Sequence, residues 1–522
     1  MTKIAIISDT HISESRTFSL PVLSASIEKI RQIKPSLTIH LGDITEKGTL
    51  ENYEKASELL SPISRNSKFL TIPGNHDVKN LGQEIFPDFF GSRVFNIVLD
   101  DIWITGLDST VPDRNDGRIG RKNLQELEKR LQSVPSHFFK VVCVHHHVVP
   151  VRGGGRERST LSDSGDILEV LQRGKCDLII TGHRHTSSIN TITTHRHKMI
   201  VMNSGTLCST KTRGREGHSF HLLDIDAEDK KVYFNRYNLT SGDMEEFERY
   251  LRVTPIKMPE TTPVARIVQI ANTHFSASGD SFKRKRYFQG VHEISSLNPK
   301  PEAIIHCGDL TDSGREKELE LAREGLMLFD PVPVVSVPGT HDWKGLGIEL
   351  FGQYFDTGGL LQTDHFVIKS CNSCLPGEKV GNLGRRVIDE IKDAMLIAKQ
   401  QRKLLIVVFH HLVVPGPHTV YTHMLEDAGE VLHALAKQQN VPVLALTGQY
   451  HVGFAFKVNK ALFVNAGTLS AVQVRSWRRN TYNIIDIYDL AGNAYFVELK
   501  IHSLQNKYSE SLGNFVFHDR SD

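Results

Sequence analysis

The sequence is poor in cysteine, in long apolar runs and in excess charge of either sign. Its six cysteines form no disulfide ladder. The 62 basic and 60 acidic side chains leave a formal net charge of +2, which gives no general argument for binding nucleic acid or an anionic membrane. No run approaches the ~18 apolar residues of a membrane span, and a strand-like run from Ile4 to Ile7 leaves no room for a signal peptide. We therefore expect a cytoplasmic protein without membrane association.

At 522 residues the chain is too long for one hydrophobic core, so two domains of roughly 250 residues are expected. The composition, with 39% hydrophobic and 23% charged residues, is ordinary for a globular protein. Histidine is the one unusual residue, with 26 occurrences.

Histidine and aspartate recur in five short blocks, and the whole series occurs twice in the same order. The first copy comprises Asp9 and His11, Gly42-Asp43, Gly74-Asn75-His76-Asp77, His145-His146-His147 and Gly182-His183-Arg184-His185. The second copy comprises Asn272 and His274, Gly308-Asp309, Gly339-Thr340-His341-Asp342, His410-His411 and Gly448-Gln449-Tyr450-His451. Corresponding residues are 263 to 266 positions apart in every block, which indicates duplication of a whole domain.

Each block directly follows a short apolar run. Runs of this kind, bounded by Gly or Pro, predict strands that are buried on both faces. Helical stretches such as 52–60 and 316–328 alternate with the first runs of each half, which predicts βαβ units. The blocks therefore lie in loops at the carboxyl ends of strands, where open α/β sheets place their sites. Three prolines between Thr254 and Pro263 predict a linker, and hence domains at 1–254 and 264–522.

The first copy offers a set of side chains that suits metal ions. Hard cations prefer anionic oxygen, and borderline cations also accept imidazole nitrogen. A carboxylate placed between two ions can bridge them, which holds the pair ~3.5–4 Å apart for displacement at phosphorus. The candidate ligands are Asp9, His11, Asp43, Asn75, His145, His183 and His185.

In this order and spacing, the blocks from Asp9 to Gly205 resemble the calcineurin-like metallophosphoesterase superfamily. The resemblance implies an α/β chain of two tandem four-layer α/β/β/α sandwiches. It also implies one metal ion bound by Asp9, His11, Asp43 and His185 and a second bound by Asp43, Asn75, His145 and His183, with Asp43 bridging. A hydroxide between the ions would attack phosphorus. His76, held by Asp77, would stabilise the developing charge or protonate the leaving group.

The segment Ser204-Gly205-Thr206, followed by a basic cluster at Lys211 and Arg213, resembles the cyclic-nucleotide phosphodiesterase branch of this superfamily. That resemblance implies hydrolysis of phosphodiester bonds in cyclic or other small nucleotides. Two divalent or trivalent ions are expected, with Mn or Fe favoured and Zn or Ni as alternatives, since an Asp/Asn/His set accepts all four.

Two other functions compete with this interpretation, a nuclease acting on DNA or RNA and a nucleotide-binding sensor with slow or no turnover. A nuclease would need a continuous basic track or stacking aromatics, which a near-neutral charge and 8% aromatic residues do not favour. A sensor would gain nothing from keeping a proton donor such as His76 beside the metal ligands.

Because the first copy has three consecutive histidines, the pattern alone leaves open which of them is the metal ligand. The second copy has Leu412 opposite His147, so the fold does not require His147. Strand geometry and the resemblance favour His145 as the ligand and leave His146 for a contact behind it.

The loop after these histidines is basic and rich in glycine. Arg152, Arg156 and Arg158 are candidates to hold a phosphate group of the substrate, and Arg213 and Arg215 are similar candidates. A solvated charged loop is the alternative. The second copy has Pro415-Gly-Pro-His418 at this place, so the basic loop belongs to the first copy alone.

The second copy keeps His274, Asp309, His341, His410 and His451 but carries Asn272, Thr340 and Gln449 in place of Asp9, Asn75 and His183. One ion would lose a carboxylate and the other would lose two of its four ligands, so neither a metal pair nor catalysis is expected there. We expect a structural partner that stands in for the second subunit of a dimer, with higher oligomers left open, or a regulatory site that binds a nucleotide without hydrolysing it.

Overall fold

The computed structural model describes residues 1–65, 67–157, 160–195, 197–214, 216–251, 257–436, 441–490 and 494–517. The chain forms two compact units, one from residues 1–192 and 196–253 and the other from residues 193–195 and 254–522. The linker expected between Thr254 and Pro263 lies partly outside the described residues. Within the described ranges, no helix combines the length and the apolar character needed to cross a membrane.

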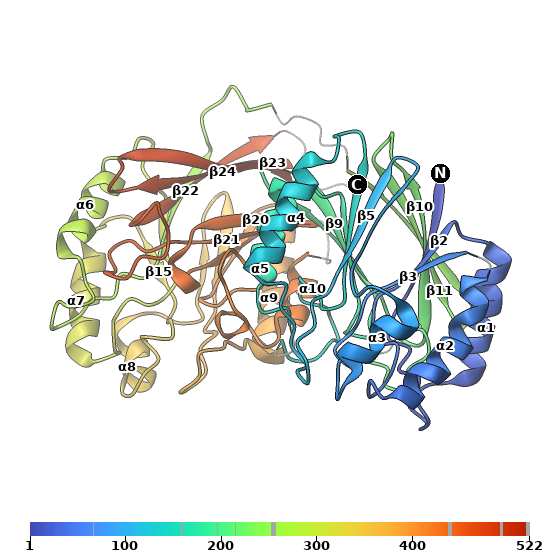
Figure 1. Cartoon of the computed structure of the whole chain (residues 1–522). Coiled ribbons are helices and arrows are strands. Elements are labelled where there is room, and N and C mark those ends of the chain that lie inside the picture. Colours follow the sequence, from blue (N-terminus) through green and yellow to red (C-terminus); the bar gives the residue numbers. More distant parts are fainter. Residues whose placement is uncertain are drawn as a thin grey trace. The chain divides into compact units, whose positions relative to one another are not determined.

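The first unit is built on two sheets (Figure 1). One sheet has the order β12 (Met244–Tyr250), β11 (Lys231–Asn238), β10 (Ser219–Asp226), β1 (Thr2–Ile7), β2 (Leu37–His40) and β3 (Lys68–Thr71). The other has the order β8 (Ser188–Thr193), β9 (Lys198–Asn203), β7 (Leu178–Thr181), β6 (Phe139–Val144), β5 (Ile102–Leu107) and β4 (Phe95–Leu99). The strands that lead into the candidate ligands are parallel to one another within each sheet, so their carboxyl ends lie at one edge of that sheet.

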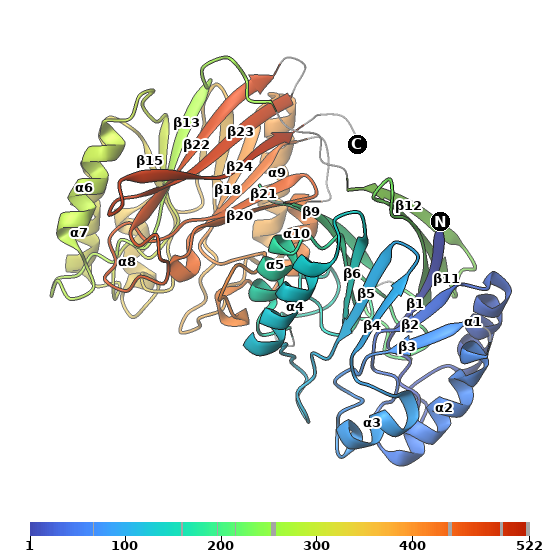
Figure 2. The same ribbon diagram turned by 45° about the horizontal axis from the view of Figure 1, so that its top comes forward.

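The two sheets of this unit pack face to face, and helices cover their outer faces. Ile4 and Ile39 of the first sheet share a buried core with Ile104 and Val141 of the second. Side chains of α1 (Leu20–Ile33) and α2 (Leu50–Ser64) pack on the other face of the first sheet, next to α3 (Gly82–Phe90). Figure 2 shows α4 (Arg121–Ser133) and α5 (Ser164–Arg173) beside the second sheet. This is the four-layer α/β/β/α arrangement that the resemblance implied.

The second unit repeats this architecture. Its first sheet has the order β15 (Val334–Ser336), β14 (Ala303–His306), β13 (Ala265–Ile270), β22 (Thr481–Leu490), β23 (Ala494–Ser503) and β24 (Tyr508–Phe517). Its second sheet has the order β16 (Leu360–Gln362), β17 (Phe366–Ser370), β18 (Leu404–Val408), β19 (Val443–Thr447), β21 (Ala461–Asn465) and β20 (Phe454–Val458). The expected tandem α/β fold is thereby confirmed.

The helices of the second unit also lie in two layers. Side chains of α6 (Arg284–Ser295), α7 (Glu316–Met327) and α8 (Gly347–Tyr354) pack with β13 and β14. The second sheet is in contact with α9 (Gly384–Gln400) and α10 (Ala428–Ala436). Two short 3₁₀ turns, η1 (Tyr421–His423) and η2 (Gln449–His451), lie in loops.

Two loops approach each other closely in each unit, and the approach requires glycine. A Cβ atom on Gly74 would lie 2.1 Å from the backbone nitrogen of Asp43 and 2.2 Å from its Oδ1. A Cβ atom on Gly339 would lie 2.2 Å from each of the same two atoms of Asp309. The loops after β2 and β14 are therefore held against the loops after β3 and β15.

We expect Gly74→Ala and Gly339→Ala each to destabilise their own unit by about 1–3 kcal/mol, because the added methyl group overlaps backbone atoms. Chemical denaturation followed by fluorescence would measure the shift. Gly352→Ala is the matched control, since a Cβ atom there meets nothing within 4 Å. Unfolding of Gly74→Ala at the wild-type denaturant concentration would show that the loops are further apart than described.

Candidate metal centre

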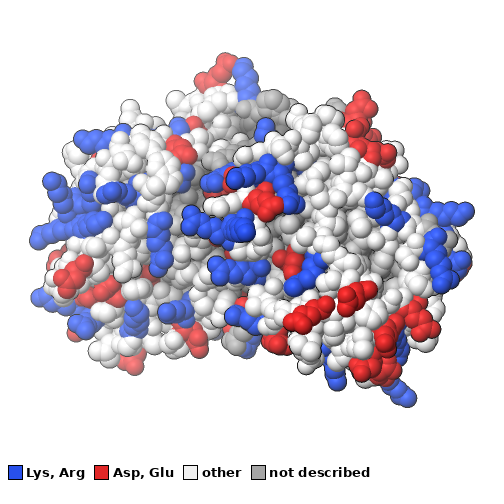
Figure 3. All heavy atoms as spheres, viewed as in Figure 1, with Lys and Arg blue, Asp and Glu red and all other residues white. Residues whose placement is uncertain are grey.

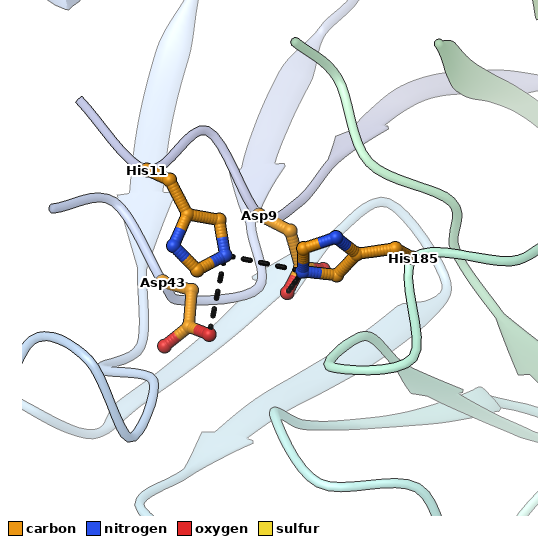
Figure 4. A group of neighbouring side chains, drawn as sticks. All are labelled: Asp9, His11, Asp43 and His185. Atoms are coloured by element: carbon orange, nitrogen blue, oxygen red, sulfur yellow. Dashed lines mark hydrogen bonds and ion pairs between the residues drawn. The ribbon is translucent and has the colours of Figure 1, made fainter. Parts of the chain in front are cut away.

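The candidate ligands of the first copy converge at the carboxyl ends of five strands. Two clusters form, one of Asp9, His11, Asp43 and His185 and one of Asp43, His145 and His183. Asp43 belongs to both clusters. Figure 4 shows the imidazoles of His11 and His185 directed at each other, with the carboxylates of Asp9 and Asp43 beside them.

Local backbone geometry turns these side chains toward one another. Asp9, His11, Asp43, His183 and His185 all have left-handed backbone, with φ between 50° and 70°. Non-glycine residues adopt this conformation only when their surroundings compensate its cost. Backbone hydrogen bonds between the loops provide that compensation, since the N–H of Asp9 donates to Gly42 O and the N–H of His11 donates to Asp43 O.

Within the first cluster, the donor atoms have the separations expected around one ion. Nε2 of His11 lies 3.1 Å from Nε2 of His185 and 3.5 Å from Oδ2 of Asp43. Nε2 of His185 lies 3.3 Å from Oδ1 of Asp9. Ligand atoms bonded to a shared ion at ~2.1 Å lie about 3–3.5 Å apart, so these four residues fit a cation between them.

The second cluster shows the same separations and includes Asn75. Nε2 of His145 lies 3.4 Å from Oδ2 of Asp43 and 3.2 Å from Oδ1 of Asn75. The same Asn75 oxygen lies 3.0 Å from Nδ1 of His183. The structure thus brings together all seven candidate ligands of the first copy.

Hydrogen bonds behind the ligands leave their lone pairs directed inward. Nδ1 of His145 donates to Leu41 O at 2.8 Å, so its Nε2 keeps a lone pair. Among the described residues, Oδ1 of Asp9, which faces the first cluster, is buried and has no hydrogen-bond partner. Buried lone pairs without donors are costly unless a cation occupies the space. The donor set of the first copy therefore fits two metal ions.

Charge accumulates at the shared carboxylate. Burial raises the pKa of Asp43, but His145, His76 and His11 lower it well below its ordinary value. Burial lowers the pKa of His145, yet Asp43 brings that pKa to about 9. Asp43 is therefore ionised, and its anionic oxygens favour a cation in place of the proton that His145 would otherwise carry.

His76 was expected to be held by Asp77, and the structure corrects this detail. Nδ1 of His76 donates to the carbonyl oxygen of Glu46 at 2.7 Å. The Asp77 carboxylate instead accepts the N–H groups of Ile44, Thr45 and Gly74 at 2.7 to 3.1 Å. Together with the hydroxyl of Thr45, these three amides occupy the acceptor sites of the carboxylate, so Asp77 fixes the loops rather than the ring.

The three consecutive histidines have distinct surroundings. His145 faces Asp43, as described above. His146 uses both ring nitrogens elsewhere, with Nδ1 2.8 Å from Oγ of Ser109 and Nε2 3.3 Å from the carbonyl oxygen of Asn115. Nε2 of His147 lies 2.8 Å from Oε2 of Glu157, and the His147 ring stacks on the ring of His183 with centroids 6.0 Å apart. His145 is therefore the residue of the run whose Nε2 faces the cluster.

The basic loop is tied to the ligand block by an arginine that sequence patterns did not reveal. The guanidinium of Arg184 is buried and donates to the carbonyl oxygens of Gly155 and Arg156 at 3.0 and 3.2 Å. It also lies 3.7 Å from Glu157. One signal was present in the sequence, because the second copy, which lacks the basic loop, has Tyr450 at the position of Arg184.

The candidate phosphate-binding arginines surround the same loop. Arg152 and Arg156 are exposed within it, and Arg213 donates a hydrogen bond to the carbonyl oxygen of Gly154. Arg158 and Arg215 lie outside the described residues. The structure thus places Arg213 against the glycine-rich loop that carries Arg152 and Arg156.

Glu46 is a further residue that sequence patterns missed. Its carboxylate accepts from Nδ1 of His11 at 2.8 Å and from Nζ of Lys211 at 2.7 Å. Burial raises the pKa of Glu46, but these two partners lower it to about 2. The second copy has Asp312 at the equivalent place, 266 residues later, so the repeat itself held the signal.

The second copy assembles only part of this arrangement. His274, Asp309 and His451 form a cluster, with Nε2 of His274 lying 3.3 Å from Nε2 of His451. Nε2 of His410 lies 3.6 Å from Asp309. At the place of His183, Gln449 turns its Oε1 to the N–H of Tyr450 at 3.1 Å.

Two more residues of the second copy flank this cluster. Nδ1 of His341 donates to the carbonyl oxygen of Asp312 at 2.8 Å, as His76 does to Glu46. Thr340 follows the close-contact glycine but has a side chain too short to span the place of Asn75.

The peptide group that follows Gly448 has the opposite orientation to its equivalent after Gly182, and this difference accompanies the replacement of Asp9 by Asn272. In the first copy the N–H of His183 donates to Oδ2 of Asp9 at 3.1 Å. In the second copy Nδ2 of Asn272 donates to the carbonyl oxygens of Gly448 and Gly467 at 2.6 and 3.0 Å. The N–H of Gln449 turns instead to the carbonyl oxygen of His410 at 3.1 Å. Asp9 thus accepts a hydrogen bond from the backbone in the first copy, whereas Asn272 donates hydrogen bonds to the backbone in the second. The residue with positive φ also differs: it is His183 in the first copy and Tyr450, the equivalent of Arg184, in the second.

Comparison with known proteins gives a family match for both copies. The model of the calcineurin-like phosphoesterase family matches residues 2–187 and 265–451. A probable cyclic nucleotide phosphodiesterase of Vesicomyosocius okutanii is 28% identical over 189 residues, which are 35% of this chain and 78% of that protein. The 3′,5′-cyclic adenosine monophosphate phosphodiesterase of Vibrio vulnificus is 26% identical over 193 residues, 35% of this chain and 69% of that protein.

Other similarities are broader. A probable glycerophosphodiester phosphodiesterase of Arcobacter nitrofigilis is 34% identical over 188 residues, 32% of this chain and 62% of that protein. Among solved structures, a purple acid phosphatase from yellow lupin is 16% identical with a TM-score of 0.39, covering 47% of this chain and 53% of its own.

We expect Asn272→Asp to destabilise the second unit by about 2–4 kcal/mol, because a carboxylate would lose two hydrogen bonds and face two carbonyl oxygens. Chemical denaturation in the presence of a chelator would measure this cost without any contribution from metal. Asn506→Asp, at an exposed position of the same unit, serves as the control. If Asn272→Asp were as stable as the wild type, the peptide group after Gly448 would have to turn to the orientation found in the first copy at no cost in free energy.

Proposed function

Because the chain belongs to the calcineurin-like phosphoesterase family, and is accordingly a metal-dependent phosphoric ester hydrolase, we propose that its first unit hydrolyses phosphodiester bonds of cyclic or other small nucleotides. The two ligand clusters that share Asp43 carry this proposal. Relatives that are named as cyclic nucleotide phosphodiesterases support the substrate class.

Seven residues would hold the two ions: Asp9, His11, Asp43, Asn75, His145, His183 and His185. When bound, such ions polarise the phosphoryl group and activate water. Two carboxylates with mixed nitrogen and oxygen donors suit Mn or Fe, with Zn and Ni as alternatives. The buried clusters keep bulk water away from the ligands, which strengthens every charge interaction in the centre.

His76 is the proposed proton donor to the leaving oxygen. Its ring lies edge-on to the ring of His11 with centroids 4.6 Å apart, and its side chain is 18% exposed. Since Nδ1 is committed to the carbonyl oxygen of Glu46, Nε2 is the nitrogen that can exchange a proton with a substrate. Lys79, with Nζ 3.2 Å from that Nε2, adds positive charge beside it.

The arginines around the glycine-rich loop are proposed to bind substrate. Arg152 and Arg156 are exposed, and Arg213 approaches the same loop through Gly154. A guanidinium can hold two phosphate oxygens at once, which suits recognition of a nucleotide. Figure 3 shows side chains of both charge signs on the face viewed there, in keeping with the small net charge.

The second unit is proposed not to catalyse the reaction. Asn272, Thr340 and Gln449 replace three ligands, and the reversed peptide at Gly448 fits the first of these changes. A unit that keeps the scaffold without the metal pair suits a structural or regulatory partner of the first.

We expect Asp43→Asn to lower kcat/KM for Mn²⁺-dependent hydrolysis of bis-p-nitrophenyl phosphate by at least about 10³-fold, because the charge shared by both ligand clusters is lost. Asp309→Asn is the matched control in the second unit and should retain wild-type activity within about twofold. A panel of cyclic and linear nucleotides on the same proteins would identify the substrate class. Equal losses in the two variants would contradict the assignment of catalysis to the first unit.

We expect His76→Ala to lower kcat by about 10²–10³-fold while the metal content stays unchanged, because a positioned proton donor contributes about this much. Elemental analysis of the purified variant would check the metal content. His341→Ala, at the equivalent place in the second unit, should leave kcat unaltered. A His76→Ala protein that keeps its metals and its full activity would rule out this role.

A further inference from the structure

The second unit retains a buried cluster of donor atoms that its proposed lack of catalysis does not explain. We propose that His274, Asp309 and His451, with the amide oxygen of Asn272, bind a single divalent cation. This inference concerns an ion additional to those of the first unit, and it does not rest on the proposed function.

The donor atoms lie at separations that one ion can span. Nε2 of His274 is 3.3 Å from Nε2 of His451 and 3.9 Å from Oδ2 of Asp309. Bonds of ~2.1 Å in a tetrahedral site place ligand atoms about 3.4 Å apart, so only small adjustments are needed. His274 and Asp309 are at most 4% exposed and His451 is partly buried, so two of the three side chains are shielded from solvent.

The two imidazoles are oriented as metal ligands are. Nδ1 of His451 lies 2.9 Å from the carbonyl oxygen of Gln473, which can only accept, so the proton is on Nδ1 and the Nε2 lone pair faces inward. Nδ1 of His274 lies 3.5 Å from the carboxylate of Asp312, an orienting partner of the kind that accompanies metal-bound histidine. Two inward lone pairs 3.3 Å apart repel each other unless a proton or a metal cation lies between them.

Asn272 supplies an independent observation. Its side chain is fully buried, and its Nδ2 donates to two backbone carbonyls, which fixes the orientation of the amide. Oδ1 of Asn272 then remains buried without a hydrogen-bond partner among the described residues. An amide oxygen in this situation is a ready ligand for a cation.

The remaining donors account for one ion rather than two. The place of the second ion keeps only His410 and the shared Asp309, because Thr340 and Gln449 replace its other ligands. Two imidazoles, one carboxylate and one amide oxygen favour borderline divalent cations such as Zn²⁺, Mn²⁺ or Co²⁺ over Ca²⁺. The single carboxylate makes this site weaker than the first cluster of the first unit, which has two.

A bound ion would join three loops of the second unit, those after β13 and β14 and the turn η2. Because the unfolded chain cannot assemble these donors, binding adds to the stability of the folded unit. The ion therefore has a structural role in this unit.

Counting metal ions per full-length chain tests this inference. The protein is loaded with Zn²⁺, freed of excess by gel filtration and analysed by plasma mass spectrometry. We expect three ions in the wild type, one in Asp9→Ala/Asp43→Ala, two in His274→Ala/His451→Ala and three in the control His292→Ala, an exposed histidine of α6. Two ions in the wild type, with none left in Asp9→Ala/Asp43→Ala, would overturn the inference.

Two further measurements separate metal loss from misfolding and from failure of the first site. Thermal unfolding in a chelator gives each protein its own metal-free midpoint, and added Zn²⁺ should raise the second-unit midpoint above that value in the wild type but not in Asp309→Asn. An equal rise in Asp309→Asn would overturn the site. If the first unit bound no metal, the wild type would hold one ion that His274→Ala/His451→Ala lacks, which would refute the proposed function and leave this inference standing.

Discussion

The carboxylate of Asp43 is held by backbone, and the rest of the first site depends on that arrangement. The loop after β3 passes so close to it that Gly74 admits no side chain, and the N–H of His76 donates to its Oδ1 at 2.8 Å. Its Oδ2 is thereby left to face both His11 and His145. One fixed carboxylate consequently belongs to two ligand clusters.

The same scaffold survives in the second unit although ligands have changed. The N–H of His341 donates to Oδ1 of Asp309 at 2.8 Å, and Asp342 accepts the N–H groups of Leu310, Thr311 and Gly339. The charge balance differs, however. Burial lowers the pKa of His185 but Asp9 raises it above its ordinary value, whereas burial and His274 lower the pKa of His451 to about 4. Around Asp309 the backbone geometry has been retained, although the electrostatics of the unit have not.

Much of the fold and of the candidate site could be predicted because both depend on local patterns. Buried parallel strands are apolar on both faces and end at Gly-rich blocks, so the repeat located β1, β2, β6 and β7 and their loops. Strands such as β4, whose residues alternate between partly buried and exposed, lack that signal. Contacts such as that of Arg184 with Gly155 could not be predicted, since they join loops whose approach only the folded chain determines. The reversed peptide beside Asn272 is likewise invisible in a sequence.

Arg184 stands between His183 and His185 while its guanidinium holds the carbonyl oxygens of the glycine-rich loop. The glycine-rich loop, which would contact a substrate, is therefore directly bonded to the segment that would hold a metal ion. Because the buried guanidinium of Arg184 makes this connection, a displacement of the loop would also displace the imidazoles of His183 and His185. Grafting the basic loop alone onto the second unit, which has Tyr450 at this position, would leave the loop without its anchor.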